Sequence, residues 1–286
     1  MAKTIDEGFK KLRSNLEITS LQEATVSTRQ TTVRKAIEQD FIVLESFLTG
    51  SYKRSTMIAP LSEADIDIFV VLNTKYYAQG QSALLESVKK TLKKKYPSTP
   101  KISPAGQAVT ITFADFKVDV VPAFNRLGGG YLIPDTNRGV WISTDPKKHV
   151  ELWSASNKAH SGDLVPLIKM IKGWNKSRSL FRSFHLEVLI YKVFTGITIS
   201  DFPSGARFFF DKARGWIKVK MADPAGYNDD VAAHINTAAE FEKLIARLDW
   251  AYKIALQAEA LAAKNDIKKA FEKWDMIFKG YFPTYG

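Results

Sequence analysis

Cysteine is absent from this 286-residue sequence, which excludes disulfide bonds and metal sites built on thiolates. Long apolar runs are also absent, because none approaches the roughly 18 consecutive residues that a membrane-spanning helix needs. The first residues lack the apolar core of a signal peptide, and no repeat or low-complexity tract stands out. From these absences we expect a cytoplasmic globular protein that does not enter a membrane.

Acidic residues are fewer than basic ones, which gives a formal net charge of +11. Such an excess favours polyanionic partners, including nucleotides and nucleic acid. Scattered surface lysines explain much of the same charge equally well, so a nucleic-acid partner stays open. The length and the apolar fraction of 45% fit one large packed domain or two ordinary ones.

The first half of the sequence alternates between helical and strand-like patterns. Apolar spacing predicts a helical region over residues 6–38, in which Thr19 or Ser20 caps a second segment, and an amphipathic helix over 81–95. A hairpin is expected at Asp115, and Pro122 is expected to close the strand that follows it. The predicted strands cover residues 41–49, 65–73, 109–113, 116–122, 131–134 and 140–143.

From about Asp145 onward the pattern is mostly helical. The predicted helices cover residues 145–158, 161–176, 182–195, 204–218 and 230–280. We therefore expect an α+β protein with two domains. Residues 1–150 would form a core with a mixed sheet and the N-terminal helices, and residues 151–286 a helical lobe that covers the active-site cleft.

The most informative stretch begins at Gly50 and Ser51, where a predicted strand turns into a short helix. Asp65 and Asp67 follow on the next predicted strand, and because they are two residues apart, their side chains leave the same face. Carboxylates bind hard divalent cations, and the start of a helix offers free N–H groups to phosphate oxygens. This stretch therefore suits a site for a metal and a triphosphate.

A third acid, Asp119, lies on a later predicted strand with Lys117 and Val121 on its own face. An acid within a central strand is uncommon unless it has a partner. If this strand neighbours the strand with Asp65 and Asp67, three carboxylates converge around two Mg²⁺ ions. The alternative is a structural acid at the edge of a sheet.

In this order, Gly50-Ser51, Asp65-x-Asp67 and the run from Asp119 to Ala123 resemble the polymerase-β-type nucleotidyltransferase superfamily. The helical half is similar to the bacterial branch of that superfamily that is related to cyclic GMP-AMP synthase and oligoadenylate synthase. The similarity covers roughly residues 40–235. The segments that carry the second resemblance are 167–175, 183–187, 222–224 and 228–231.

The resemblance implies a set of site residues. It makes Asp65, Asp67 and Asp119 the catalytic residues and the ligands of Mg²⁺, with Mn²⁺ as a substitute. It makes Gly50, Ser51, Lys172 and Ser183 the residues that bind the nucleotide. Structural alternatives stay open for three of these, since Ser51 and Ser183 would also serve as helix N-caps and a lysine such as Lys172 is usually solvated.

Other residues near these motifs have simpler interpretations. Trp174 is expected in the core rather than as a platform for a base, and Lys169, one turn before Lys172, as a surface residue. The histidines have no spacing typical of metal ligands, so we interpret them as structural or surface residues. They are His149, His160, His185 and His234.

The resemblance implies an enzyme that joins nucleoside triphosphates into a cyclic di- or trinucleotide signal in anti-phage defence. We expect a monomer whose product acts on a downstream effector. One alternative is an enzyme that extends RNA or nucleotidylates another acceptor with the same acids. A second is an inactive nucleic-acid-binding module, against which the retention of all three acids argues.

Overall fold

The structure is a computed structural model that describes residues 2–99 and 101–286. The chain divides into a sheet unit, Ile18–Glu151, and a helical unit, in which the segment that ends at Glu17 joins Leu152–Gly286. The expected division near residue 150 lies close to the second junction, which falls inside helix α5 (Pro146–Ala159). The first helix, however, groups with the C-terminal residues rather than with residues 18–150.

The helical region predicted over residues 6–38 consists of two helices, and the second begins at the expected cap. They are α1 (Ile5–Leu16) and α2 (Ser20–Ile37). A capping box begins each helix: the side chains of Thr4 and Thr19 each accept a hydrogen bond from the backbone N–H of the residue three positions later, and the side chain of that residue accepts one from the backbone N–H of the threonine. The predicted cap at Thr19 is therefore confirmed.

The mixed sheet of the sheet unit is also confirmed. Its strand order is β1-β2-β5-β4-β3, β6 continues from β5, and β7 pairs with β6. Strands β2 and β5 are parallel, and the other neighbouring strands are antiparallel. The strands are β1 (Val43–Leu48), β2 (Asp65–Leu72), β3 (Lys101–Ala105), β4 (Ala108–Thr112), β5 (Lys117–Asn125), β6 (Tyr131–Asp135) and β7 (Val140–Thr144).

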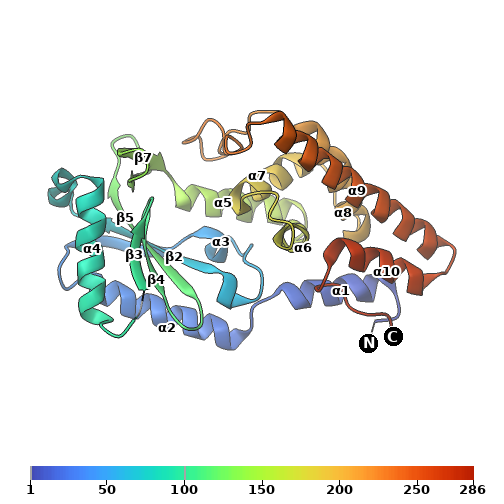
Figure 1. The fold of residues 1–286 in the computed structure, drawn as a ribbon, viewed down its shortest axis with the longest axis horizontal. Helices are drawn as coiled ribbons and strands as arrows, with labels where there is room; N and C mark the ends of the chain where they lie inside the picture. Colours follow the sequence, from blue (N-terminus) through green and yellow to red (C-terminus); the bar gives the residue numbers. More distant parts are fainter. Residues whose placement is uncertain (1, 100) are drawn as a thin grey trace. The chain divides into compact units, whose positions relative to one another are not determined.

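Helices cover one face of this sheet (Figure 1). Apolar side chains of β2 and β5 join those of α2 and of α4 (Gln81–Lys95) in the larger core of the unit. On the opposite face, Phe69 and Val121 pack with Tyr131 of β6 in a smaller cluster. The alternation of the two central strands thus separates two apolar layers. Short helices complete the unit: α3 (Gly50–Lys53) and the 3₁₀ helices η1 (Leu61–Glu63) and η2 (Thr74–Gln79).

Two strand predictions were incomplete. Strand β3 was not expected, and it contains Pro104, which weakens its sequence pattern. The expectation that Pro122 closes its strand was wrong, because β5 continues to Asn125. Strand β4 pairs with β5 only as far as Val120, so the proline, which has no N–H, lies beyond that ladder. The hairpin at Asp115 is confirmed between β4 and β5.

The helical unit contains α6 (Leu164–Lys176), α7 (Ser183–Phe194), α8 (Phe202–Ala213) with the 3₁₀ helix η3 (Arg214–Trp216), α9 (Ala238–Ala263) and α10 (Ile267–Phe278). The single helix predicted over 230–280 was wrong in two respects. Helix α9 begins only after the cap at Thr237, and the chain breaks at Asn265, whose φ of 62° is not helical. Asp266 then caps α10.

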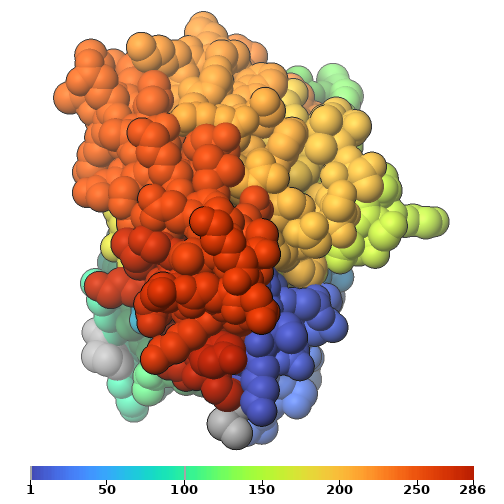
Figure 2. All heavy atoms as spheres, turned by 90° about the vertical axis from the view of Figure 1, so that its right-hand side faces the viewer, coloured from blue at the N-terminus to red at the C-terminus, as the bar shows by residue number. Residues whose placement is uncertain are grey.

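The two ends of the chain lie together in the helical unit, where the blue N-terminal residues border the red C-terminal ones (Figure 2). Phe9 of α1 is buried against Trp274 and Phe278 of α10 and against Phe282. This aromatic contact explains why α1 belongs to the helical unit. Within the described residues, no helix has the length and apolar character that crossing a bilayer would require.

Candidate active site

A glycine brings the start of α3 against β2. Gly50 has a φ of +65°, and a Cβ at this position would lie 1.8 Å from Oδ2 of Asp67. Thr49 N–H also donates to the carbonyl oxygen of Asp67 at 2.9 Å. Only glycine combines this backbone conformation with this close approach, so residue 50 fixes the carboxylate beside the first turn of α3, which contains Ser51.

The strand pairing brings the three predicted acids to one face. In the parallel ladder of β2 and β5, Asp65 pairs with Lys117 and Asp67 pairs with Asp119. Residues that pair directly in a parallel ladder point to the same side of the sheet, and so do residues two apart. Asp65, Asp67 and Asp119 therefore lie on the face that carries Phe69 and Val121 further along, opposite the face covered by α2 and α4.

The pKa values of Asp67 and Asp119 are also consistent with three carboxylates that lie close together. Burial, followed by the neighbouring carboxylates of Asp119 and Asp65, raises the pKa of Asp67 to about 7, and Arg54 opposes this shift. Burial also raises the pKa of Asp119, with a further contribution from Asp65, while the hydrogen bond from Thr110 and the charge of Lys117 lower it. Carboxylates that repel one another in this way favour a bound cation.

Asp65 and Asp119 each interact with a neighbouring side chain. Nζ of Lys117 lies 3.8 Å from Oδ1 of Asp65, and the hydroxyl of Thr110 donates to Oδ1 of Asp119 at 2.6 Å. Across residues 2–99 and 101–286, no three or more histidine, aspartate or glutamate side chains form a ready-made metal cluster. The acids are brought together, but Asp65 and Asp119 are turned toward Lys117 and Thr110.

The donor set nevertheless fits a hard divalent cation. Three carboxylates supply oxygen ligands of the kind that Mg²⁺ prefers. Burial raises the pKa of Asp67, and the carboxylates of Asp119 and Asp65 add to this shift, so a bound cation would relieve their repulsion. The missing Cβ of Gly50 allows the carboxylate of Asp67 to lie directly against the start of α3. A cation would compete with Lys117 for Asp65 and with Thr110 for Asp119.

The two nucleotide-binding candidates of the helical half lie in the helical unit. Lys172 of α6 is buried, and its Nζ lies 3.0 Å from Oε1 of Glu187 on α7. Ser183 is exposed at the first residue of α7. Of the alternatives left open by the sequence, a solvated Lys172 is wrong. Lys169, expected at the surface, is also buried and contacts Glu17.

The N-cap alternatives for the two serines were wrong as well. The residue that caps α3 is Thr49, so Ser51 is the second helical residue, and Arg182 precedes Ser183 at the cap position of α7. Trp174 is fully buried, as expected for a core residue.

Sequence reasoning missed two residues that contact or influence the acids. Thr110 bonds to Asp119 because β4 pairs with β5 in the register that places these two residues opposite each other. Arg54, one turn after Gly50, lowers the pKa of Asp67. Neither role had a signal in the sequence, because that of Thr110 depends on the register between β4 and β5, and that of Arg54 on the direction of the side chain that follows α3.

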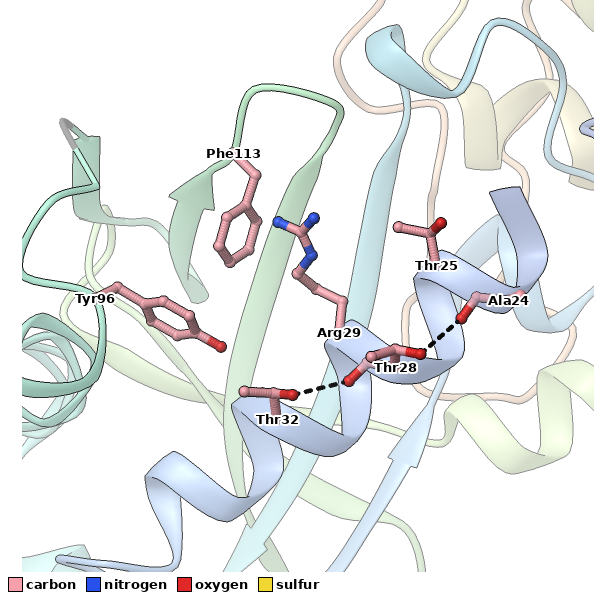
Figure 3. Close-up of a pocket in the computed structure, with 7 residues that line it drawn as sticks. All are labelled: Ala24, Thr25, Thr28, Arg29, Thr32, Tyr96 and Phe113. Atoms are coloured by element: carbon pink, nitrogen blue, oxygen red, sulfur yellow. Dashed lines mark hydrogen bonds between the residues drawn. The ribbon is translucent and has the colours of Figure 1, made fainter. Parts of the chain in front are cut away.

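A separate pocket of about 390 Å³ lies on the helix-covered side of the sheet unit (Figure 3). Arg29 of α2 contributes its guanidinium, which lies 3.8 Å from the ring centre of Phe113 and pairs with Asp115 at 2.7 Å. Tyr96, with Ala24 and the threonines of α2, completes the lining. None of the predicted site residues lines this pocket, so it is distinct from the carboxylate face.

The sequence was compared with protein families and with characterised proteins. Residues 3–157 match the family described as the Second Messenger Oligonucleotide or Dinucleotide Synthetase domain. The chain is 25% identical to a cyclic AMP-AMP-AMP synthase from Acinetobacter sp., over 98% of this chain and 86% of that protein.

Two solved structures show the same fold. The structure of E. coli MS115-1 CdnC with ATP has a TM-score of 0.77 at 16% identity and covers 97% of this chain and 98% of its own. The Vibrio cholerae DncV cyclic AMP-GMP synthase, in complex with a linear intermediate, has a TM-score of 0.76 at 14% identity and covers 95% of this chain and 94% of its own.

Proposed function

The chain belongs to the family of Second Messenger Oligonucleotide or Dinucleotide Synthetases, and we propose that Asp65, Asp67 and Asp119 are its catalytic residues. It is a nucleotidyltransferase of a family that makes cyclic di- or trinucleotides from nucleoside triphosphates. The observation that carries the site assignment is the direct pairing of Asp67 with Asp119 beside Gly50. Spacing along the chain alone would not require these residues to meet.

In the proposed reaction, a nucleotide hydroxyl attacks the α-phosphate of a second nucleoside triphosphate. The new bond joins the hydroxyl oxygen to the α-phosphorus, and the bond to the β-phosphate oxygen breaks, so pyrophosphate leaves. Asp119 orients the hydroxyl and accepts its proton, a role that its raised pKa favours. A second transfer, after the linear intermediate is repositioned, closes the ring.

Asp65, Asp67 and Asp119 would also hold Mg²⁺ or Mn²⁺, which when bound would offset the negative charge of the triphosphate. The backbone at Gly50 and the hydroxyl of Ser51 contact phosphate oxygens from the sheet unit. In the helical unit, Lys172 and Ser183 supply a positive charge and a further hydroxyl for the triphosphate.

In the cell, the product would act as a signal in anti-phage defence. We propose that the enzyme works as a monomer on the nucleoside triphosphates of the cytoplasm. The cyclic product would bind a downstream effector.

The activity is tested by incubating the protein with all four nucleoside triphosphates and Mg²⁺ or Mn²⁺. Phosphatase treatment and chromatography should then reveal an oligonucleotide that resists phosphatase, because a ring has no terminal phosphate. A product that forms only when RNA is added would instead support RNA extension. Tight RNA binding without product under any metal would support the inactive module.

The site is tested by replacing Asp65 and Asp67 together with alanine. We expect synthesis to fall by at least about a hundredfold, since removal of one preorganised charge-stabilising group already costs about that much. The fold should persist, as judged by circular dichroism and thermal unfolding. Asp115→Asn is the matched control, because this acid of the same unit pairs with Arg29 instead. Full synthesis in the double variant would refute the assignment.

A further inference from the structure

Helix α6 carries two lysines, Lys169 and Lys172, within a continuous run of buried residues. Each ammonium contacts a glutamate from elsewhere in the helical unit, Lys169 with Glu17 and Lys172 with Glu187. The two glutamates differ in exposure, because the side chain of Glu17 is 41% exposed and that of Glu187 is 0% exposed. Helix α6 thus carries two lysine–glutamate ion pairs, one partly exposed to solvent and one buried.

The position of Glu187 on α7 is also informative. Glu187 follows Ser183 by four residues, so both side chains lie on the same face of the helix. Side chains on a helix lean toward its N-terminus, and Glu187 therefore holds the ammonium of Lys172, at 3.0 Å, on the side of the helix where Ser183 begins it. The pair brings Lys172 and Ser183 to the same end of α7.

The connection between the two helices is fixed by an amide side chain. Oδ1 of Asn175 on α6 accepts hydrogen bonds from the backbone of Leu180 and Phe181, both at 3.0 Å. Its Nδ2 donates to the carbonyl oxygen of Phe181 at 2.9 Å. Asn175 thus sets how α7 follows α6, and so the register in which Lys172 reaches Glu187.

Burial makes the charge of Lys172 dependent on its surroundings. Removing an ammonium from water favours the neutral amine, and a nearby carboxylate favours the charged form. A neutral amine has no net charge with which to attract a phosphate. A lysine that binds a triphosphate from this buried position therefore needs negative charge close to it.

We propose that Glu187 is a positioning residue for nucleotide binding, which keeps Lys172 charged and oriented toward the first turn of α7. This inference rests on the proposed function, in which Lys172 contacts the triphosphate. Glu187 does not itself contact the nucleotide, because its carboxylate would repel the phosphates. Its contribution to nucleotide binding passes through Lys172.

The test is the pH dependence of the KM for nucleoside triphosphate, measured between pH 7 and pH 9 at saturating Mg²⁺. In Glu187→Gln, Lys172 should lose its proton at lower pH, so KM should rise by at least about fivefold across this range. The wild type and Glu17→Gln, the matched control beside Lys169, should change by less than about twofold. A profile of Glu187→Gln that equals the wild-type profile would overturn the proposal.

A rescue experiment separates charge from packing. Arginine stays charged throughout this pH range, so adding Lys172→Arg to Glu187→Gln should abolish the pH dependence of KM, and its persistence would overturn the proposal. If Glu187→Gln does not fold, Glu187→Asp serves instead. The aspartate keeps the negative charge but places it one methylene farther from Lys172. The KM of Glu187→Asp should therefore rise without becoming dependent on pH. An unchanged KM would contradict the positioning role of Glu187.

Lys172→Met distinguishes this inference from the proposed function. If KM at pH 7 is unchanged in that variant, Lys172 does not bind the triphosphate and the proposed assignment itself fails. If KM rises in Lys172→Met but the profile of Glu187→Gln stays flat, only the role of Glu187 fails.

Discussion

At the scale of single residues, the site depends on a missing side chain as much as on the acids. Gly50 places its backbone in a conformation that L-residues rarely adopt, directly against the carboxylate of Asp67. A Cβ there would force that carboxylate to move. The position of Asp67 is therefore set by the neighbouring loop as well as by its own strand.

Gly50→Ala should reduce synthesis by at least about tenfold, because a displacement of about an ångström at a reacting centre can cost more than that. The left-handed backbone should also lower the free energy of unfolding by about 1–2 kcal/mol. Gly139→Ala is the matched control, since Gly139 has a similar φ of +68° but no atom within 4 Å of a Cβ. Steady-state rates and urea unfolding separate the two effects. Equal activity in both variants would contradict the role of the close approach.

The identity of the acids could be predicted from the sequence, whereas their immediate partners could not. Asp65 and Asp67 alternate along one strand, which is a local property that the sequence contains. The pairing of Thr110 with Asp119 depends on the register between β4 and β5. Register is set by tertiary packing and by the turn, so the neighbours of an acid become known only with the fold.

At the scale of elements, α7 is joined to the turn segment before α9 by two histidines. The rings of His185 on α7 and His234 in that segment lie 5.2 Å apart with an interplanar angle of 80°. Nδ1 of His185 and Nε2 of His234 are buried without a hydrogen-bond partner among the described residues. Burial, and then the nearby His234, lower the pKa of His185 to about 4, while Asp230 opposes this.

This contact should make the helical unit sensitive to acid. Because the pKa of His185 is lower in the folded state than its usual value of 6.5, the unfolded state binds the proton more readily. Above about pH 6.5 His185 is neutral in both states and does not affect stability. As the pH drops from there to about 4, its protonation in the unfolded state should lower the free energy of unfolding by roughly 2–4 kcal/mol. His234 acts in the same direction, because burial and then Arg182 lower its pKa, while Asp230 and Glu240 oppose this.

His185→Phe keeps an aromatic ring but removes the titration, so it should flatten this part of the pH dependence. Urea unfolding followed by tryptophan fluorescence at several pH values measures it, because five of the six tryptophans lie in the helical unit. Asp230→Asn should steepen the loss, since that carboxylate favours the charged histidine. An unchanged slope in His185→Phe would show that other groups cause the acid sensitivity.

Helices with strong periodicity were predicted more reliably than breaks and edge strands. The buried stripe of α4 was legible in the sequence, and its predicted range, 81–95, equals the observed helix. The break at Asn265 lies in a segment of good helix formers, where one residue in a left-handed conformation ends α9. Strand β3 is short and contains Pro104, so pairing with β4 rather than intrinsic preference makes it a strand.

At the scale of the whole molecule, the helical unit is discontinuous in sequence. The segment that ends at Glu17 leaves the N-terminal half of the chain to complete a core formed by Leu152–Gly286. The sequence showed that α1 is amphipathic but not which core receives its apolar face, because periodicity describes a helix and not its partner. A boundary drawn once along the chain therefore cannot describe these units.

Phe9→Ala should test this assignment of α1. The ring of Phe9 is almost fully buried, and its centre lies 4.9 Å from that of Trp274 and 5.3 Å from that of Phe282. Its loss should destabilise the helical unit by about 3–5 kcal/mol, because the cavity opens between α1 and α10. Lys10→Ala, at an exposed position of the same helix, should cost less than about 0.5 kcal/mol. Hydrogen exchange locates the effect: amides of α10 should lose protection while those of β2 and β5 keep it. If only the amides of β2 and β5 lost protection, α1 would instead pack against the core of the sheet unit. This follows because a packing defect first weakens the core from which the side chain was removed.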